Sequence, residues 1–331
     1  MSITDLPEGA LPRFACRLNS MGAQPGQGGW PAGRPTTADL IRRLSKATGI
    51  TAVELNYPPH FDGTDVDELI EVAAEVDLPI TSVNLRFPDD PFLAGTLSNP
   101  DAGIRAQAVK TVVDAAEASK GFGANLVTMW LDKDGWDYPF QIDHARAWDH
   151  LIEGLKEIVA AAPDVRFSIE YKPSEPRSFS MLGNFGTTMM AVDAVGADNL
   201  GVRLDFCHVL MAKETPGQVA ALATARDKLF GIDFNDGYGH QDDGLMIGSV
   251  RIVETLEFLW YLRRGPFDGV VYFDTFPIRE NPELEAAENV RRFEVMWRAA
   301  GRLSEADMAE LMAGQDAMAV QQRVFDTIWS S

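Results

Sequence analysis

The sequence predicts a single α/β domain folded as a (β/α)₈ barrel, with a short helical extension at the C-terminus. Eight short runs rich in Val, Ile, Leu and Phe alternate with longer segments in which apolar residues recur every three or four positions, as strands and helices do. No shift in composition and no Gly/Ser linker divides the chain, and its 331 residues fit one large barrel. We therefore assign residues 1–300 to the barrel and 301–331 to the C-terminal helical extension.

The eight apolar runs are the predicted strands. A doubly wound sheet would show the same alternation, but neither Gly-x-Gly-x-x-Gly nor Gly-x₄-Gly-Lys-Ser/Thr follows any of the runs, so its phosphate-binding signature is missing. The barrel is therefore preferred, with strands at 13–18, 51–56, 79–85, 124–130, 165–170, 199–205, 229–233 and 269–274.

Amphipathic segments between these strands are the predicted helices. They cover 36–47, 64–75, 101–120, 143–161, 184–195, 215–226, 250–263 and 280–300, with Thr37, Thr64, Asn99 and Asp143 as plausible N-caps. One or two further helices are expected over 303–329. The Gly/Pro-rich stretch 22–35 follows the first strand and is either an active-site lid or an inert excursion.

Composition excludes several classes of function. The chain has 49 acidic and 29 basic side chains, a net charge of -20, and no long Lys/Arg run, so nucleic acid is not an expected partner. No apolar stretch is long enough to span a membrane, and the first residues lack the pattern of a signal peptide. Cys16 and Cys207 lie in apolar runs as buried free thiols, which favours a reducing compartment. We expect a cytoplasmic protein with no membrane partner.

Four of the predicted strands end on a carboxylate. Parallel barrel strands place their C-terminal ends around one rim, the face on which barrel enzymes hold their active sites. Anions gathered there need a cation, and all-oxygen ligation suits Mg²⁺ or Mn²⁺. The alternative is a set of independent helix N-caps or solvated loop acids. The four candidate metal ligands are Glu170, Asp205, Asp233 and Asp274.

Three further polar groups converge on this rim. His208 lies three residues after Asp205, within reach of the ion, although it could be a packed loop histidine. Lys172 lies two residues after Glu170, so the two side chains project to the same side of the extended backbone. The lysine is then either a neutraliser of the acids' charge or a group that handles protons and orients the substrate. The loop after the seventh strand adds Asp242, unless that loop is simply a solvated turn.

The segment Ile169–Arg177, IEYKPSEPR, resembles the Glu-x-Lys-Pro-x-Glu-Pro-Arg segment of xylose isomerase and, less closely, of bacterial L-rhamnose isomerase. The chain thus resembles the xylose isomerase-like superfamily of TIM-barrel sugar isomerases and epimerases over roughly residues 80 to 300. The resemblance implies that Glu170 is a metal ligand and that Lys172 polarises a substrate oxygen.

Other motifs extend this resemblance. The pair Asp205 and His208 is similar to the family's acid-x-x-His motif, in which the acid bridges two metals and the histidine binds the second. Asp233 and Asp274 match the remaining acids of the first metal site. Trp130 falls on the family's strand-4 tryptophan, which forms an apolar wall beside the sugar.

Two departures concern the second metal and ring opening. Where the family has Asp-x-Asp-Leu for the second metal, this chain has Asp242 followed two residues later by Gly244. The second strand ends at Asn56 without the family's ring-opening histidine, and the nearest candidate is His60. One ion is therefore expected, and a second stays open.

The leading hypothesis is a divalent-metal-dependent isomerase that interconverts an aldose and a ketose. The catalytic candidates are Lys172, His208 and Glu170, and the metal candidates also include Asp205, Asp233, Asp274 and Asp242. Candidate substrate-binding residues are Trp130, Trp136, Phe87, Arg86 and Asn56. Arg86 could read an anionic group on the substrate or pair with Asp89 or Asp90.

Other hypotheses remain open. The runner-up is a one-metal epimerase or lyase that abstracts a proton from a keto-sugar, similar to the large subunits of C-glycoside deglycosidases. A DNA-repair endonuclease would share the barrel. The chain has too few histidines for such an enzyme, five in all, and its charge of -20 disfavours binding to DNA. A non-catalytic sugar-binding barrel is the last alternative. Expected partners are a small sugar and a second copy in a homo-oligomer, with a small partner subunit left open.

Overall fold

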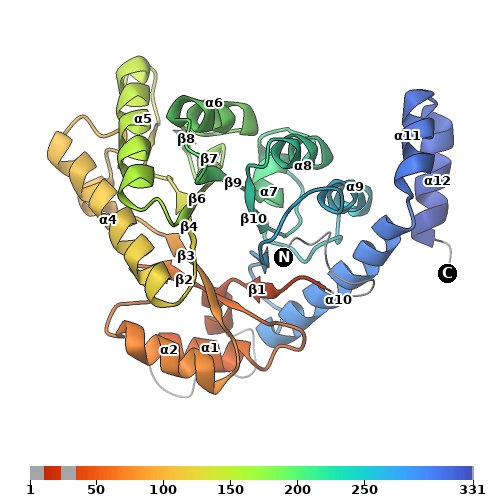
Figure 1. The fold of residues 1–331 in the computed structure, drawn as a ribbon, viewed down its shortest axis with the longest axis horizontal. Helices are drawn as coiled ribbons and strands as arrows, with labels where there is room; N and C mark the ends of the chain where they lie inside the picture. The colour runs from red at the N-terminus through yellow and green to blue at the C-terminus, as the bar shows by residue number, and fades with distance from the viewer. Residues whose placement is uncertain (1–10, 24–34, 330–331) are drawn as a thin grey trace.

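The computed structural model describes residues 11–23 and 35–329 of the chain. Within these residues, eight parallel strands form the expected barrel, surrounded by helices (Figure 1). Each strand overlaps one of the predicted runs. The strands are β1 (Phe14–Cys16), β2 (Val53–Tyr57), β3 (Ile80–Leu85), β4 (Leu126–Trp130), β6 (Arg166–Glu170), β9 (Leu200–Asp205), β10 (Leu229–Asp233) and β11 (Val271–Phe273).

The barrel is nearly closed. Its strand order is β1-β11-β10-β9-β6-β4-β3-β2. Across the remaining seam between β1 and β2, the backbone N–H of Ala52 donates to the Phe14 carbonyl at 3.0 Å. Side chains alternate along each strand, so that Val127 and Met129 of β4 face the helices while Thr128 pairs inside the barrel with Ser168 of β6. The apolar core therefore lies between the strands and the helices.

All the predicted helices are present. They are α1 (Thr37–Leu44), α2 (Val66–Glu75), α4 (Ala102–Gly121), α5 (His144–Ala161), α6 (Phe185–Val195), α8 (Pro216–Ala225), α9 (Ile252–Leu262) and α10 (Pro282–Gly301). The sequence did not predict the short elements η2 (Leu18–Gly22), α3 (Asp89–Phe92) and α7 (Phe206–Met211), or the small sheet of β5 (Gly135–Trp136), β7 (Ser174–Glu175) and β8 (Ser178–Ser180).

The first residue of several helices is set by a side chain that accepts a hydrogen bond from a backbone N–H group of the first turn. Asp143 caps α5 as predicted. The caps of α1, α2 and α4 are Thr36, Asp65 and Asp101, each one or two residues from the predicted position. Thr36 and Asp39 form a reciprocal capping box, which fixes the first turn of α1 immediately before its buried face.

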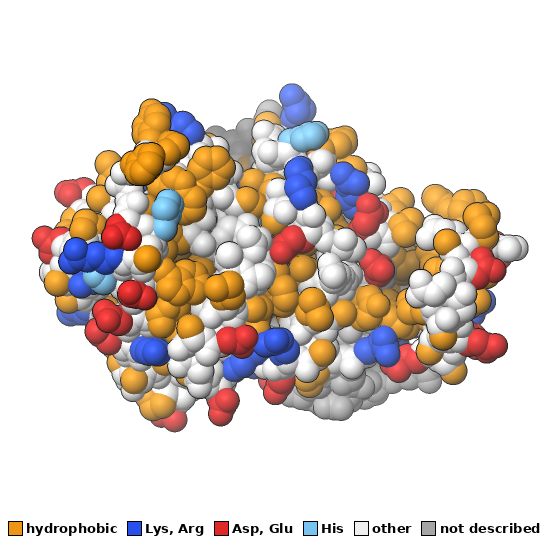
Figure 2. All heavy atoms as spheres, turned by 90° about the horizontal axis from the view of Figure 1, so that it is seen from above, with side chains coloured by type: hydrophobic (Ala, Val, Ile, Leu, Met, Phe, Trp, Pro, Cys, Tyr) orange, Lys and Arg blue, Asp and Glu red, His pale blue; other side chains and the backbone are white. Residues whose placement is uncertain are grey.

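Two helices follow α10, namely α11 (Glu305–Ala313) and α12 (Ala317–Trp329). The Trp260 indole N–H donates to the Leu303 carbonyl at 2.8 Å, and the Arg302 guanidinium donates to the Thr327 carbonyl at 2.5 Å. The two helices α11 and α12 form a lobe at the right edge of Figure 2. A groove of about 390 Å³ between α9, α10 and α12 is lined mainly by apolar side chains, including Ile252, Leu256, Val295, Met296, Ile328 and Trp329.

Three further sequence-based expectations concern the cysteines, membrane-spanning helices and the loop after the first strand. Cys16 and Cys207 are both buried free thiols, as expected. No helix in 11–23 or 35–329 is both long and apolar enough to cross a bilayer. Residues 24–34 of the suggested lid segment lie outside the described part of the chain.

Candidate active site

The strand register brings the four strand-end carboxylates to one end of the barrel. Asp205 of β9 and Asp233 of β10 are register partners, and Glu170 of β6 lies opposite Arg203 of β9. Asp274 follows β11 directly. All four acids are buried, with 1% to 7% of their surface exposed. The barrel thus concentrates negative charge where water is largely excluded.

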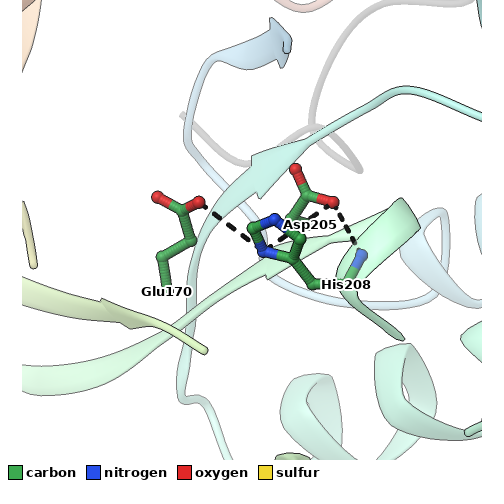
Figure 3. A group of neighbouring side chains, drawn as sticks. All are labelled: Glu170, Asp205 and His208. Carbon is green, nitrogen blue, oxygen red and sulfur yellow. Dashed lines mark hydrogen bonds and ion pairs between the residues drawn. The ribbon is translucent and has the colours of Figure 1, made fainter. Parts of the chain in front are cut away.

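Glu170, Asp205 and His208 form the centre of this cluster (Figure 3). The Nδ1 atom of His208 lies 3.6 Å from Glu170 Oε1 and 3.9 Å from Asp205 Oδ1. Asp205 is the N-cap of α7 and accepts the His208 backbone N–H at 2.9 Å, which fixes the position of the histidine relative to the acid. One ligand atom from each of these residues lies within 4.8 Å of the others.

Burial and mutual repulsion raise the pKa values of these acids. Burial raises the pKa of Asp205 to about 8. The charge of His208 lowers this pKa, whereas the charges of Asp242 and Asp274 raise it further. Burial also raises the pKa of Asp274 to about 6. The pKa of Asp233 lies well above its ordinary value because of burial, although Arg203 opposes this. Without a cation, the cluster therefore retains protons near neutral pH.

Some polar atoms of the cluster have no hydrogen-bond partner although they are buried. They are Asp274 Oδ1, His208 Nδ1 and Asp242 Oδ1. Buried polar atoms are normally satisfied, so such atoms converging beside several carboxylates require an explanation. A divalent cation with a preference for oxygen ligands, such as Mn²⁺ or Mg²⁺, would satisfy carboxylate oxygens among them and displace the protons of the acids. The residues present therefore fit such an ion.

His208, Asp242 and Lys172 form a charged chain at the edge of the cluster. His208 Nε2 lies 3.2 Å from Asp242 Oδ2, and the Lys172 ammonium donates to the same oxygen at 3.0 Å and also pairs with Glu175. Burial alone would lower the pKa of His208, but Asp205 and Asp242 raise it to about 9. Burial opposes ionisation of Asp242, yet His208 and Lys172 lower its pKa to about 2.

A buried ion triad below the site was missed by sequence reasoning. Arg203 is 1% exposed and donates to Asp233 Oδ1 at 2.6 Å and to Glu54 Oε2 at 2.9 Å. Its third donor reaches Thr128 Oγ1 at 3.1 Å. Arg203 therefore occupies one oxygen of Asp233 and leaves the other for a ligand. The sequence did contain a signal for Arg203. It is a charged residue in an otherwise apolar strand, and it lies two residues before Asp205, so both side chains are on the same face.

A cavity of about 630 Å³ opens onto the cluster. Asp205 and Asp233 are not part of its wall, whereas Arg17, Phe276 and His240, which were not selected from the sequence, are. Lys172 and Arg86 both lie over the Trp130 ring, at 5.4 and 5.0 Å from its centroid. Of the residues selected from the sequence, the wall includes Arg86, Trp130, Glu170, Lys172, His208, Asp242 and Asp274.

Gly244 is the position at which the resemblance led us to expect a second-metal carboxylate, and the structure leaves no space there for a side chain. Its φ is +56°, and a Cβ would lie 2.3 Å from Cδ2 of Phe276. The thiol of Cys207 fills nearby space and offers a ligand atom within 4.8 Å of Asp205 and Asp242. The Phe276 ring therefore occupies the volume that a carboxylate side chain at this position would need.

Four other candidates lie away from the cavity wall. Trp136 belongs to the small sheet, edge-on to His144, and Phe87 packs on Phe92 in the core. Asn56 is buried, and its backbone N–H donates to His60 Nδ1 at 2.8 Å. His60 Nε2 must then carry the proton shared with Asn19 Oδ1 at 2.7 Å, so both ring nitrogens are engaged.

Comparisons with known proteins agree with this architecture. The family model described as xylose isomerase-like TIM barrel matches residues 42–296. A probable sugar isomerase of Mesorhizobium japonicum is 31% identical over 224 residues, which are 64% of this chain and 49% of that protein. A xylose isomerase of Thermus thermophilus is 26% identical over 212 residues, which are 62% of this chain and 54% of that protein. The chain spans about half the length of these curated relatives.

Solved structures resemble the whole barrel. A D-tagatose 3-epimerase-like protein superposes with a TM-score of 0.70 at 15% identity, covering 88% of this chain and 99% of the other. An L-ribulose 3-epimerase superposes with a TM-score of 0.66 at 15% identity, covering 92% and 98%. At this identity the likeness concerns the fold, whereas the family model covers most of the sequence. The chain belongs to the xylose isomerase-like TIM-barrel family.

Proposed function

We propose that the protein is a sugar isomerase or epimerase that depends on one divalent ion, Mn²⁺ or Mg²⁺, held by Glu170, Asp205, Asp233 and Asp274. The observation that carries this proposal is the group of four buried carboxylates on β6, β9, β10 and the end of β11, beneath a cavity lined by Trp130 and Lys172. When bound, such an ion acts as a Lewis acid on a substrate oxygen.

Two carboxylates are available for proton transfer in the cavity. Glu170 and Asp274 both line its wall, and their strands are separated in the barrel by β9 and β10. They therefore approach a bound sugar from different directions. An oxygen of either carboxylate that the ion leaves free can take up and return a proton.

Lys172 and Trp130 orient the sugar. Burial opposes the charge of Lys172, but Asp242 and Glu175 hold its pKa above the ordinary value, so it stays an ammonium group and donates hydrogen bonds. It lies over the Trp130 ring, which presents an apolar face to the sugar and excludes water. His208 lies between Glu170 and Asp242 and contacts both acids.

One-ion proton transfer is the reaction class that these residues support best. Phe276 occupies the volume of the missing second-metal carboxylate, and His60 lies outside the cavity wall with both nitrogens engaged. The reaction is then removal of a proton from the carbon beside a carbonyl. Its return to the same carbon gives an epimer, and its return to the neighbouring carbon gives the aldose or ketose isomer.

A two-ion aldose–ketose isomerase that moves a hydride is the second candidate. Asp205, His208 and Asp242 lie together, and the buried Asp242 Oδ1 has no hydrogen-bond partner. The two curated relatives described above, a probable sugar isomerase and a xylose isomerase, favour the aldose–ketose interconversion of this candidate.

Solvent deuterium incorporation separates the two candidates. The metal-loaded enzyme is incubated in D₂O with a panel of ketoses and aldoses, and products are examined by NMR alongside a metal count by mass spectrometry. We expect one ion per chain and deuterium on the product carbon. Two ions with no deuterium would instead support hydride transfer. Absence of both ion and turnover would contradict the proposed function. Asp205→Asn should be inactive, and the exposed Asp198→Asn is its matched control and should stay active.

A further inference from the structure

Arg86 is a cation of the cavity wall that forms no ion pair within the described residues. It follows β3, and its backbone N–H donates to the Tyr57 carbonyl at 2.9 Å. Its guanidinium is half-buried and donates to the Leu85 carbonyl at 2.9 Å. The other guanidinium N–H groups have no protein acceptor within the described ranges, and the side chain lines the cavity.

Two nearby acids, Asp89 and Asp132, are already paired with another cation, and Asp90, the other partner considered from the sequence, forms no ion pair with Arg86. Asp89, one of the two partners considered from the sequence, pairs with Lys133 at 2.9 Å, and Asp132 pairs with the same lysine at 2.8 Å. The other cations of the cavity wall also have carboxylate partners. Arg17 lies 3.4 Å from Asp274, and Lys172 lies 3.0 Å from Asp242. Arg86 therefore differs from both of them in having its charge available.

The geometry of Arg86 suits an anionic ligand. Its guanidinium lies over the Trp130 ring at 5.0 Å, which restrains the planar fork in one orientation. A restrained guanidinium donates two parallel hydrogen bonds to a carboxylate or a phosphate. Its positive charge also acts on Asp274, so the anion-binding end of the cavity and the carboxylate cluster share one electrostatic environment.

We propose that the substrate is an acidic sugar, whose carboxylate or phosphate group is bound by Arg86 while its hydroxyl and carbonyl oxygens face the carboxylate cluster. The placement of the hydroxyl and carbonyl oxygens at the carboxylate cluster rests on the proposed function. Arg86 is then the specificity-determining residue that selects anionic over neutral sugars, because a neutral sugar would leave its charge unpaired in a half-buried site.

Calorimetric titration of the Mn²⁺-loaded protein tests this directly. The probes are D-hexuronates and ketohexose 6-phosphates, each matched with its neutral sugar. We expect at least one anionic probe to bind 10-fold or more tightly than its neutral partner. Arg86→Met should remove that preference, a loss on the order of 10- to 100-fold, with neutral affinity unchanged. Arg86→Lys should restore more binding to a phosphate than to a planar carboxylate, which distinguishes the two sources of anion.

The exposed Arg146→Met serves as the matched control and should bind like the unaltered protein. Equal or tighter binding of the neutral sugars, no binding of any probe, or an equal loss for both classes in Arg86→Met would overturn the inference. If an ion binds and solvent deuterium enters a neutral product, only this inference fails. If no ion binds, the proposed function itself fails.

Discussion

Gly244 and Phe276 show how two residues decide the composition of the site. The glycine has a positive φ, and the backbone N–H of Phe276 donates to its carbonyl at 2.9 Å, so the aromatic ring is held against it. The same ring lies under the Arg17 guanidinium at 4.9 Å, and Arg17 pairs with Asp274. The ring that fills the space beside Gly244 thus also contacts the arginine that pairs with Asp274, one of the proposed metal ligands.

Replacing Gly244 alone should not create a second metal site. Gly244→Asp introduces a Cβ into the Phe276 ring at a positive φ, and we expect destabilisation by about 1–3 kcal/mol with no added ion. Combining it with Phe276→Ala removes the collision and should permit a second ion. Metal counts and urea unfolding check both variants. A second ion in Gly244→Asp with unchanged stability would show that Phe276 does not exclude the carboxylate.

Arg203 is expected to be essential for stability as well as for the ligand geometry of Asp233. Arg203→Met leaves Glu54 and Asp233 buried without their cation, which should cost about 3–5 kcal/mol. Arg226, in the exposed ion pair with Asp193, is the matched control, and its Met variant should cost under about 1 kcal/mol. Equal urea midpoints for the two variants would contradict this account of the triad.

Sequence reasoning identified residues at strand ends better than residues inside the barrel. A carboxylate that ends a strand has its position set by the parallel register, so Glu170, Asp205, Asp233 and Asp274 could be placed together from spacing alone. The pairing of Arg203 with Glu54 spans 149 residues and depends on which strands lie across the barrel. Trp130 also ends a strand and lines the cavity, whereas Trp136 and Phe87 lie in connecting segments, where the strand register does not set the position of a side chain.

Among the elements, the barrel strands and long helices were predictable because their periodicity extends over several residues. The small sheet was not, since β5 and β7 have two residues each. Its consequence for the site is local. β7 carries Glu175, which pairs with Lys172, and therefore helps to hold the lysine over Trp130. Three of the four predicted N-caps were misplaced by one or two residues, because nearby Thr, Asp and Asn residues are all competent caps.

The last helix should contribute little to the stability of the barrel. Within α12, only Thr327 is buried, whereas Met308 of α11 is packed in the core. Removing residues 315–331 should therefore leave the far-UV spectrum of the barrel in place and lower Tm by about 2–5 °C. Truncation before α11, at residue 303, is the contrasting variant and should cost more. Equal Tm losses for both truncations would argue against this ranking.

At the scale of the whole molecule, the charge of -20 has two components. Part of it is the concentrated cluster inside the barrel. On the face shown in Figure 2, acidic side chains lie among Lys and Arg side chains, without a broad basic patch. The formation of a homo-oligomer stays a prediction, as does a boundary between residues 300 and 301.

Stability should depend on pH through Glu285 of α10. Burial, together with the charge of Glu280, raises the pKa of Glu285 from 4.5 to about 7. The folded state then binds more protons than the unfolded state between these values, so this residue's contribution to the free energy of unfolding falls as pH rises from about 4.5 to 7, by at most about 3 kcal/mol. Glu285→Gln should flatten that part of the profile in urea titrations. An unchanged pH profile would contradict the assignment.

The central claim is that one divalent ion binds at the four strand-end carboxylates. Anomalous diffraction from a crystal loaded with Mn²⁺ tests it most directly, because the position and number of ions are read together. We expect a single strong peak bounded by Glu170, Asp205, Asp233 and Asp274, and no peak in an Asp205→Asn crystal treated in the same way. A peak that persists in the variant, or no peak between these carboxylates in the unaltered protein, would contradict the claim.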